Sequence, residues 1–300
     1  MTRWMVWVPR AALVGALAYA GLQGYWAAGH APAWVFGRDL TFPAWLVIVL
    51  CVAAAAVVAG LRASGGRRVL IVAAWLIGIG LVSAAAMFLL DVVGGILPGL
   101  GIPQDVPGLL SRGACLSVGL LTAATALSWM RRTREGCGRC VGIPRLESTP
   151  RWAYAGAYAA VAGCLIRIVA QTTMGVSIPY TDSPALLVFE AGFLLGGVLL
   201  PLALAHGWGK VWPRWVLPLA GRRVPRWLVV GPGFAIAVAL LAYFGVGMTQ
   251  MIRETVEGAL EEPAFMWVAV PGYVLWGIGL AVASVAYYRI TRPACARCGR

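Results

Sequence analysis

The stretch PAWLVIVLCVAAAAVVAGLR, residues 43–62, decides the fold class, because its only charged residue is the last one. As a helix rising 1.5 Å per residue, about 20 such residues cross the roughly 30 Å hydrocarbon core of a bilayer. Similar stretches recur along the 300-residue chain, which is 61% hydrophobic and only 12% charged, about half the charged fraction of a soluble domain. The sequence therefore predicts an integral membrane protein.

Eight spans are expected, and all of them should be helices, since unpaired backbone amides are costly in lipid. The alternating pattern of a membrane β-barrel is not visible in the sequence. The expected spans are residues 11–29, 43–62, 69–91, 112–130, 152–173, 184–205, 227–249 and 264–288. Within the sixth, Gly192-x-x-x-Gly196 predicts the close approach of a neighbouring helix. The predicted fold class is an all-α membrane protein with eight transmembrane helices.

The net charge of +13 comes from short basic clusters between the apolar spans, a pattern typical of topology signals and not of nucleic-acid binding. Of the 24 Lys and Arg residues, 20 lie in alternate connections, namely 1–10, 62–68, 131–151, 206–226 and 289–300. Because basic connections stay on the cytoplasmic side, we expect a multi-pass membrane protein with both termini in the cytoplasm. The preference for Arg over Lys, together with many Ala, Gly and Pro residues, resembles proteins of high-GC bacteria, which implies a bacterial plasma membrane.

Three pairs of similar segments recur in the same order in the two halves of the chain. They are PAWLVIVL and PALLVFEA at 43–50 and 184–191, GRRV at 66–69 and 221–224, and RRTREGCGRC and RITRPACARC at 131–140 and 289–298. We infer an internal duplication, with residues 1–140 and 141–300 as two four-helix repeats. Since four is an even number, the two repeats are expected to be parallel, related by an axis along the membrane normal.

Each repeat ends in a C-x-x-C pair, Cys137 with Cys140 and Cys295 with Cys298, on the expected cytoplasmic side. Two such pairs from separate segments are the ligand set of a tetrahedral structural zinc site. We therefore expect zinc to clip the two halves together. Two other interpretations stay open, namely that each pair is a redox dithiol or that the cysteines have no function. Since all four positions on the metal would be filled, catalysis at the zinc is not expected.

Arg167 and Glu190 are charges placed well inside expected spans. Counted at about 1.5 Å per residue, they lie at nearly the same depth in the outer third of the bilayer, on consecutive antiparallel helices. An unpaired charge there costs at least a few kcal/mol, so a mutual ion pair is expected. Gln23, Gln171 and Asp91 lie at comparable or shallower levels, and together the five residues could line a cavity open to the outside. Two alternatives stay open, namely a structural pair that fixes helix register and charged side chains that reach to the membrane surface.

The stretch WGKVWPRWVLPLAGRRVP at 208–225 resembles a motif of actinobacterial multi-spanning membrane proteins of unknown function, and LQGYWAAG at 22–29 resembles their first span. The chain departs from that pattern at Lys210, where an acid is expected, and at Gln23, where a base is expected. The resemblance implies a multi-spanning membrane protein. It implies no activity, cofactor or functional residue.

The leading functional interpretation is a non-enzymatic permease for a small solute or an ion, with an outward-facing polar pocket. The alternative is a membrane-anchored sensor or partner-binding subunit with a cytoplasmic zinc-clipped pair of C-x-x-C motifs, and a second alternative is an intramembrane redox or lipid-modifying enzyme. The sequence holds no P-loop, H-E-x-x-H or G-x-S-x-G motif, so an enzyme is less favoured. The expected partner is the bilayer, with no nucleic acid. A cytoplasmic protein partner and a homo-oligomer stay open.

Overall fold

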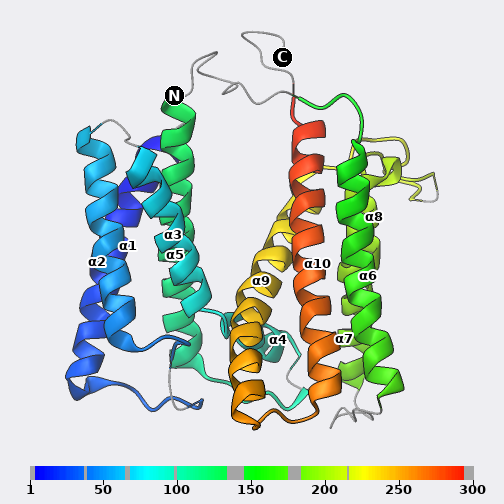
Figure 1. Ribbon diagram of the computed structural model, residues 1–300. Helices are drawn as coiled ribbons and strands as arrows, with labels where there is room; N and C mark the ends of the chain where they lie inside the picture. The colour runs from blue at the N-terminus through cyan, green and yellow to red at the C-terminus, as the bar shows by residue number, and fades with distance from the viewer. Residues whose placement is uncertain are drawn as a thin grey trace. The chain divides into compact units, whose positions relative to one another are not determined.

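The computed structural model describes residues 4–36, 39–64, 68–97, 100–133, 145–174, 184–214 and 216–293. About 80% of the chain is helical, and within the described residues the extended backbone pairs only in an isolated bridge between Val211 and Arg223. The helices divide into two compact units, α1 to α5 and α6 to α10 (Figure 1). The predicted helical class is confirmed.

Seven segments of the described chain are long and apolar enough to cross a membrane. They are Trp4–His30, Ala44–Ala63, Val106–Arg132, Arg151–Thr173, Leu187–Ala205, Arg226–Glu257 and Pro263–Ile290. Each overlaps one of the expected spans. In both units many large apolar side chains on these helices are exposed, such as Val14 and Ile278, as expected where a helix faces lipid.

The third expected span is not one continuous helix. It consists of α3 (Arg68–Ala84) and α4 (Phe88–Ile96), which are bent by 46° relative to each other. The carbonyl oxygen of Ala84 accepts the N–H of Thr41 at 3.0 Å, while the N–H of Phe88 turns to the carbonyl of Ala85 at 2.9 Å. At the break, the Ala84 carbonyl thus bonds to a residue before the second span in place of the N–H of Phe88, four residues further along the chain. If the bent pair is one span, the number of candidate spans rises to eight.

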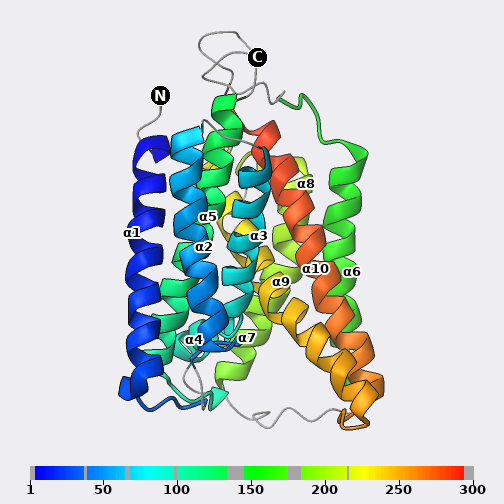
Figure 2. The same cartoon turned by 60° about the vertical axis from the view of Figure 1, so that its left-hand side comes forward.

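The first unit is a bundle of α1 (Trp4–Tyr25, extended by the π-helical turn η1, Trp26–His30), α2 (Ala44–Ser64), α3, α4 and α5 (Val106–Thr133) (Figure 2). Helix α5 packs against α1 and α3, and α2 packs against the same two helices. Small side chains such as Ala16, Ala54 and Cys115 fill its core, which lets the helices approach closely.

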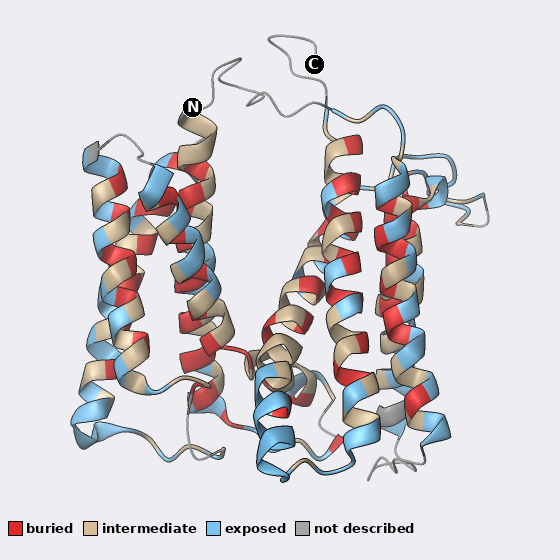
Figure 3. Cartoon of the chain, in the orientation of Figure 1, coloured by how far each residue is buried: buried red, intermediate tan, exposed pale blue. Residues whose placement is uncertain are grey.

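The second unit contains α6 (Arg151–Thr173), α9 (Arg226–Glu257), α10 (Pro263–Ile290) and a composite span. That span runs through α7 (Pro184–Leu194), the π-helical turn η3 (Leu195–Leu199) and α8 (Leu200–Ala205), and the short helix η4 (Gly207–Gly209) follows it. The π-helical turn η3 ends two residues before Pro201, which has no N–H to donate to the helix. Figure 3 shows buried positions recurring along α6 and α10 with exposed ones between them, as in helices that pack on one side.

Helices α6 and α10 cross at glycines. A Cβ added to Gly163 would lie 2.4 Å from the carbonyl oxygen of Gly272, and one added to Gly279 would lie 2.4 Å from that of Gly156. The backbones therefore touch without intervening side chains. Of the predicted pair Gly192 and Gly196, only the second lies near a neighbouring helix. A Cβ at Gly196 would lie 3.4 Å from the Ile236 side chain, whereas one at Gly192, on an exposed face of α7, would meet nothing within 4 Å.

The spans are arranged in the same way in both units. In each unit the first span contacts the second and the fourth, and the third span contacts the same two. Short connections give this arrangement in any up-and-down four-helix bundle. The internal duplication therefore stays a prediction.

Replacing Gly163 by Ala is expected to lower the melting temperature of the detergent-solubilised protein. The new methyl group would overlap the Gly272 carbonyl, and such overpacking costs about 1–3 kcal/mol. Gly192→Ala is the matched control, because it is also a helical glycine of the second unit but has open space around it. Equal melting temperatures for the two variants would contradict the crossing of α6 and α10 described above.

Candidate functional site

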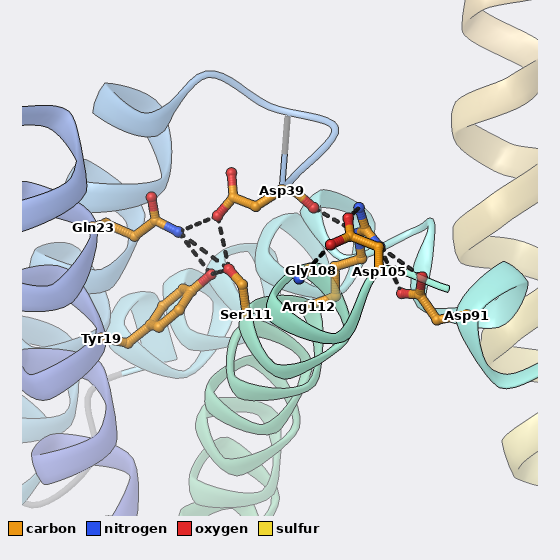
Figure 4. A network of polar contacts seen from close by, with 8 residues as sticks. All are labelled: Tyr19, Gln23, Asp39, Asp91, Asp105, Gly108, Ser111 and Arg112. Atoms are coloured by element: carbon orange, nitrogen blue, oxygen red, sulfur yellow. Dashed lines mark hydrogen bonds and ion pairs between the residues drawn. The ribbon is translucent and has the colours of Figure 1, made fainter. Parts of the chain in front are cut away.

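A buried arginine, Arg112, organises the polar side chains of the first unit (Figure 4). Its side chain is fully buried, and Nη1 donates to both carboxylate oxygens of Asp91, at 2.6 and 2.8 Å. Nη2 donates to Oδ2 of Asp105 at 3.2 Å, and Nε donates to the backbone carbonyl of Asp39 at 2.6 Å. The guanidinium also lies over the ring of Phe36, 5.3 Å from its centre. All three nitrogens thus bond within the unit.

The start of α5 explains why Arg112 is inside a helix. Asp105 precedes the first helical residue, its Oδ1 accepts the N–H of Gly108 at 3.0 Å, and its carbonyl accepts the N–H of Leu109 at 2.7 Å. This is a helix N-cap. The expected start of the span at residue 112 was too late, since α5 begins at Val106.

A second group of hydrogen bonds joins α1 to the same region (Figure 4). Nε2 of Gln23 donates to Oδ2 of Asp39 at 2.7 Å and to the hydroxyl of Tyr19 at 2.9 Å. Oγ of Ser111 donates to Oδ2 of Asp39 at 2.7 Å and lies 2.8 Å from the hydroxyl of Tyr19. Because the hydrogen of Ser111 goes to Asp39, the Tyr19 hydroxyl is the donor to Ser111. We call these residues, together with Asp91, Asp105 and Arg112, the Arg112 network.

The second unit holds a cavity of about 190 Å³ between α6 and α7. It is lined by Arg167, Ile168, Gln171, Thr172, Glu190, Phe193 and Leu194. We call it the Arg167 cavity. Arg167 and Gln171 are four residues apart on α6, so they lie on one face of that helix.

Aromatic rings hold the Arg167 guanidinium. Its Nε donates to the hydroxyl of Tyr273 at 2.8 Å, and its carbon lies 4.7 Å from the ring centre of Phe193 and 5.8 Å from that of Tyr273. Among the described residues, neither of its terminal nitrogens has a hydrogen-bond partner. Oε1 of Gln171 also lacks a partner, but it is buried from the cavity. The cavity therefore offers the terminal donors of Arg167.

The ion pair expected between Arg167 and Glu190 does not form. Cation–π contacts and the Tyr273 hydroxyl hold the guanidinium instead, and the Glu190 carboxylate is exposed at the edge of the same cavity. The two opposite charges thus share a cavity but make no contact with each other.

The five residues expected to line one pocket are divided between the units. Arg167, Glu190 and Gln171 line the Arg167 cavity. Gln23 and Asp91 belong to the Arg112 network of the first unit. The residues that contact Arg112 and Arg167 and that the sequence did not indicate are mainly aromatic or lie near helix ends. Of these, Asp105 carried a usable signal, since an Asp shortly before a Pro marks a helix start.

The four cysteines of the expected zinc site, Cys137, Cys140, Cys295 and Cys298, lie outside the described residues. The zinc site therefore stays a prediction. In the part of the chain that the structure describes, no group of three or more His, Cys, Asp or Glu residues could hold a metal ion.

The segment that resembles a family motif, 208–225, packs back on the end of the second unit. Nζ of Lys210 donates to Oγ1 of Thr149 at 2.8 Å, and burial lowers the pKa of Lys210 from its usual value. The hydroxyl of Tyr287 donates to the carbonyl of Gly209 at 2.8 Å.

In comparisons with known proteins, the chain matches no protein-family model, no curated protein and no solved structure.

Replacing Arg112 by Met is expected to lower the free energy of unfolding by about 3–5 kcal/mol, because it leaves the Asp91 and Asp105 carboxylates buried without a cation. Chemical unfolding in detergent micelles measures the change. Lowering the pH should restore part of the loss, since protonation removes the unpaired negative charge.

Arg253→Met is the matched control. This substitution removes the ion pair between Arg253 and Glu257, whose side chains are 78% and 52% exposed, respectively. Its loss should lower the free energy of unfolding by at most about 0.5 kcal/mol. If the Arg112 and Arg253 variants unfold alike, the Arg112 network does not hold the first unit together.

Proposed function

We propose that this chain is an integral protein of a bacterial plasma membrane that binds a small polar solute in the Arg167 cavity and carries it across the bilayer. In this proposal the chain crosses the membrane eight times, with the bent pair α3 and α4 as one span and both termini in the cytoplasm. The seven candidate spans and the bent pair support the count, and the alternating basic connections support the orientation.

The observation that carries the proposal is the incomplete hydrogen bonding of Arg167. A guanidinium has five N–H donors, and within the described residues only Nε of Arg167 has a hydrogen-bond acceptor. Ionisable groups inside membrane spans are costly and usually pair with one another or face a water-filled cavity. Arg112 follows the first pattern, and Arg167 lines a cavity with a neighbouring unpaired amide oxygen.

The depth of the cavity fits a site reached from the outer surface. Arg167 is six residues before the end of α6 at Thr173, and Glu190 is six residues after the start of α7 at Pro184. At 1.5 Å per residue each lies about 9 Å from that end of the helices. With both termini in the cytoplasm, that end faces outward, so a solute would enter the cavity from outside.

Flux into liposomes tests this proposal. We expect at least one solute from a panel of chloride, nitrate, lactate and alanine to enter liposomes that contain the protein faster than liposomes that lack it. Arg167→Ala should reduce that flux by about tenfold or more, since a hydrogen bond to a charged group contributes about 1.5–3 kcal/mol.

Arg226→Ala is the matched control, because Arg226 also lies over two aromatic rings of the second unit, Trp227 and Tyr288, but does not line the cavity. The proposal fails if no solute of the panel crosses, or if flux survives Arg167→Ala unchanged.

A further inference from the structure

We infer that the Arg167 cavity takes a zwitterion, that is, a compact solute or headgroup with an ammonium group and a carboxylate or phosphate. This inference rests on the proposed function and narrows the class of ligand. It assigns the anionic group to Arg167 and the ammonium group to Glu190.

The charges of the cavity exclude simpler ligands. Arg167 and Glu190 line the same cavity without an ion pair between them. A plain anion on Arg167 would lie in the field of the Glu190 carboxylate, and a plain cation on Glu190 would lie in the field of the guanidinium. A ligand that carries both charges satisfies both residues and adds no net charge to the membrane.

The geometry of Arg167 suits an anionic group with two oxygens. Its Nε is held by Tyr273 and its carbon lies over Phe193, so the guanidinium plane is fixed and the terminal nitrogens remain as donors. Such a planar pair of donors matches a carboxylate or a phosphate. Oε1 of Gln171 is buried beside the cavity and is not exposed to it, so the exposed Glu190 carboxylate is the acceptor for the ammonium group.

The size of the cavity limits the ligand. Its volume of about 190 Å³ equals that of roughly six waters at about 30 Å³ each. A free amino acid of small or medium size fits, and the apolar side chains of Ile168 and Leu194 line the cavity beside the polar groups. The ethanolamine phosphate headgroup of a lipid has the same pair of charges. The shared chemistry therefore has two sources, a dissolved amino acid and a lipid headgroup.

Binding of three related probes tests the inference in nanodiscs of phosphatidylglycerol, which has no ammonium group. L-alanine carries both charges, N-acetyl-L-alanine lacks the ammonium and L-alanine methyl ester lacks the carboxylate. We expect alanine to bind about tenfold or more tightly than either analogue. Glu190→Gln should abolish the preference for alanine over the N-acetyl compound, and Arg167→Gln the preference for alanine over the ester.

Glu254→Gln is the control variant, since Glu254 is exposed on α9 and does not line the cavity. Thermal melting verifies that each variant is folded. In a second arm, nanodiscs contain phosphatidylethanolamine, and the lipid retained by the protein is measured by native mass spectrometry. If the protein retains phosphatidylethanolamine, both Arg167→Gln and Glu190→Gln abolish that retention, and alanine does not bind, then the ligand is the lipid headgroup. Alanine binding in phosphatidylglycerol nanodiscs assigns the dissolved solute.

Two results overturn the inference, and they are distinguishable. If N-acetyl-L-alanine binds as tightly as alanine, depends on Arg167 and binds more tightly after Glu190→Gln, the ligand is an anion and the proposed solute site survives. If neither the three probes nor phosphatidylethanolamine bind in a way that depends on Arg167, the zwitterion and the proposed function both fail.

Discussion

A positive charge inside a bilayer needs compensation from the protein, and the Arg112 guanidinium receives it from three directions. Asp91 comes from α4, Asp105 caps α5, and the carbonyl of Asp39 comes from the connection before α2. Much of the local architecture of the first unit follows from this cation. The bend between α3 and α4 precedes Asp91, the early start of α5 places Arg112 within a helix, and Gln23 of α1 joins the network through the Asp39 side chain.

Arg167 is also an arginine within a helix, but in the part of the chain that the structure describes no carboxylate pairs with its guanidinium. Aromatic faces and one hydroxyl hold it, Glu190 does not pair with it, and its terminal nitrogens lack partners among the described residues. A protein that needed only a rigid structure could satisfy this arginine as it satisfies Arg112. The open terminal donors are therefore the strongest structural argument for a ligand, because an anionic group in the cavity can accept the hydrogen bonds that the protein does not make.

The approximate position of the apolar helices could be predicted because hydrophobic length is a local property of the sequence, whereas the count of eight spans stays a prediction. The break after Ala84 could not be predicted, since nothing local shows that Thr41, far away in the chain, binds the Ala84 carbonyl. The glycine spacing was only partly informative, because Gly196 meets a neighbouring helix and Gly192 does not. For the sites, Arg167 and Glu190 line one cavity, but the expectation that they pair with each other failed, since the rings of Phe193 and Tyr273 hold the guanidinium. The duplication and the zinc site stay predictions.

If the two arginine sites differ as proposed, the Arg167 cavity holds water and solutes while the Arg112 network is dry. Hydroxyl-radical footprinting of the protein in lipid nanodiscs, read residue by residue by mass spectrometry, measures this difference. We expect oxidation of Phe193, which lines the cavity, and protection of Tyr19, which is 3% exposed within the Arg112 network, although tyrosine is intrinsically at least as reactive. A protected Phe193, or a Tyr19 oxidised as readily as Phe193, would contradict it.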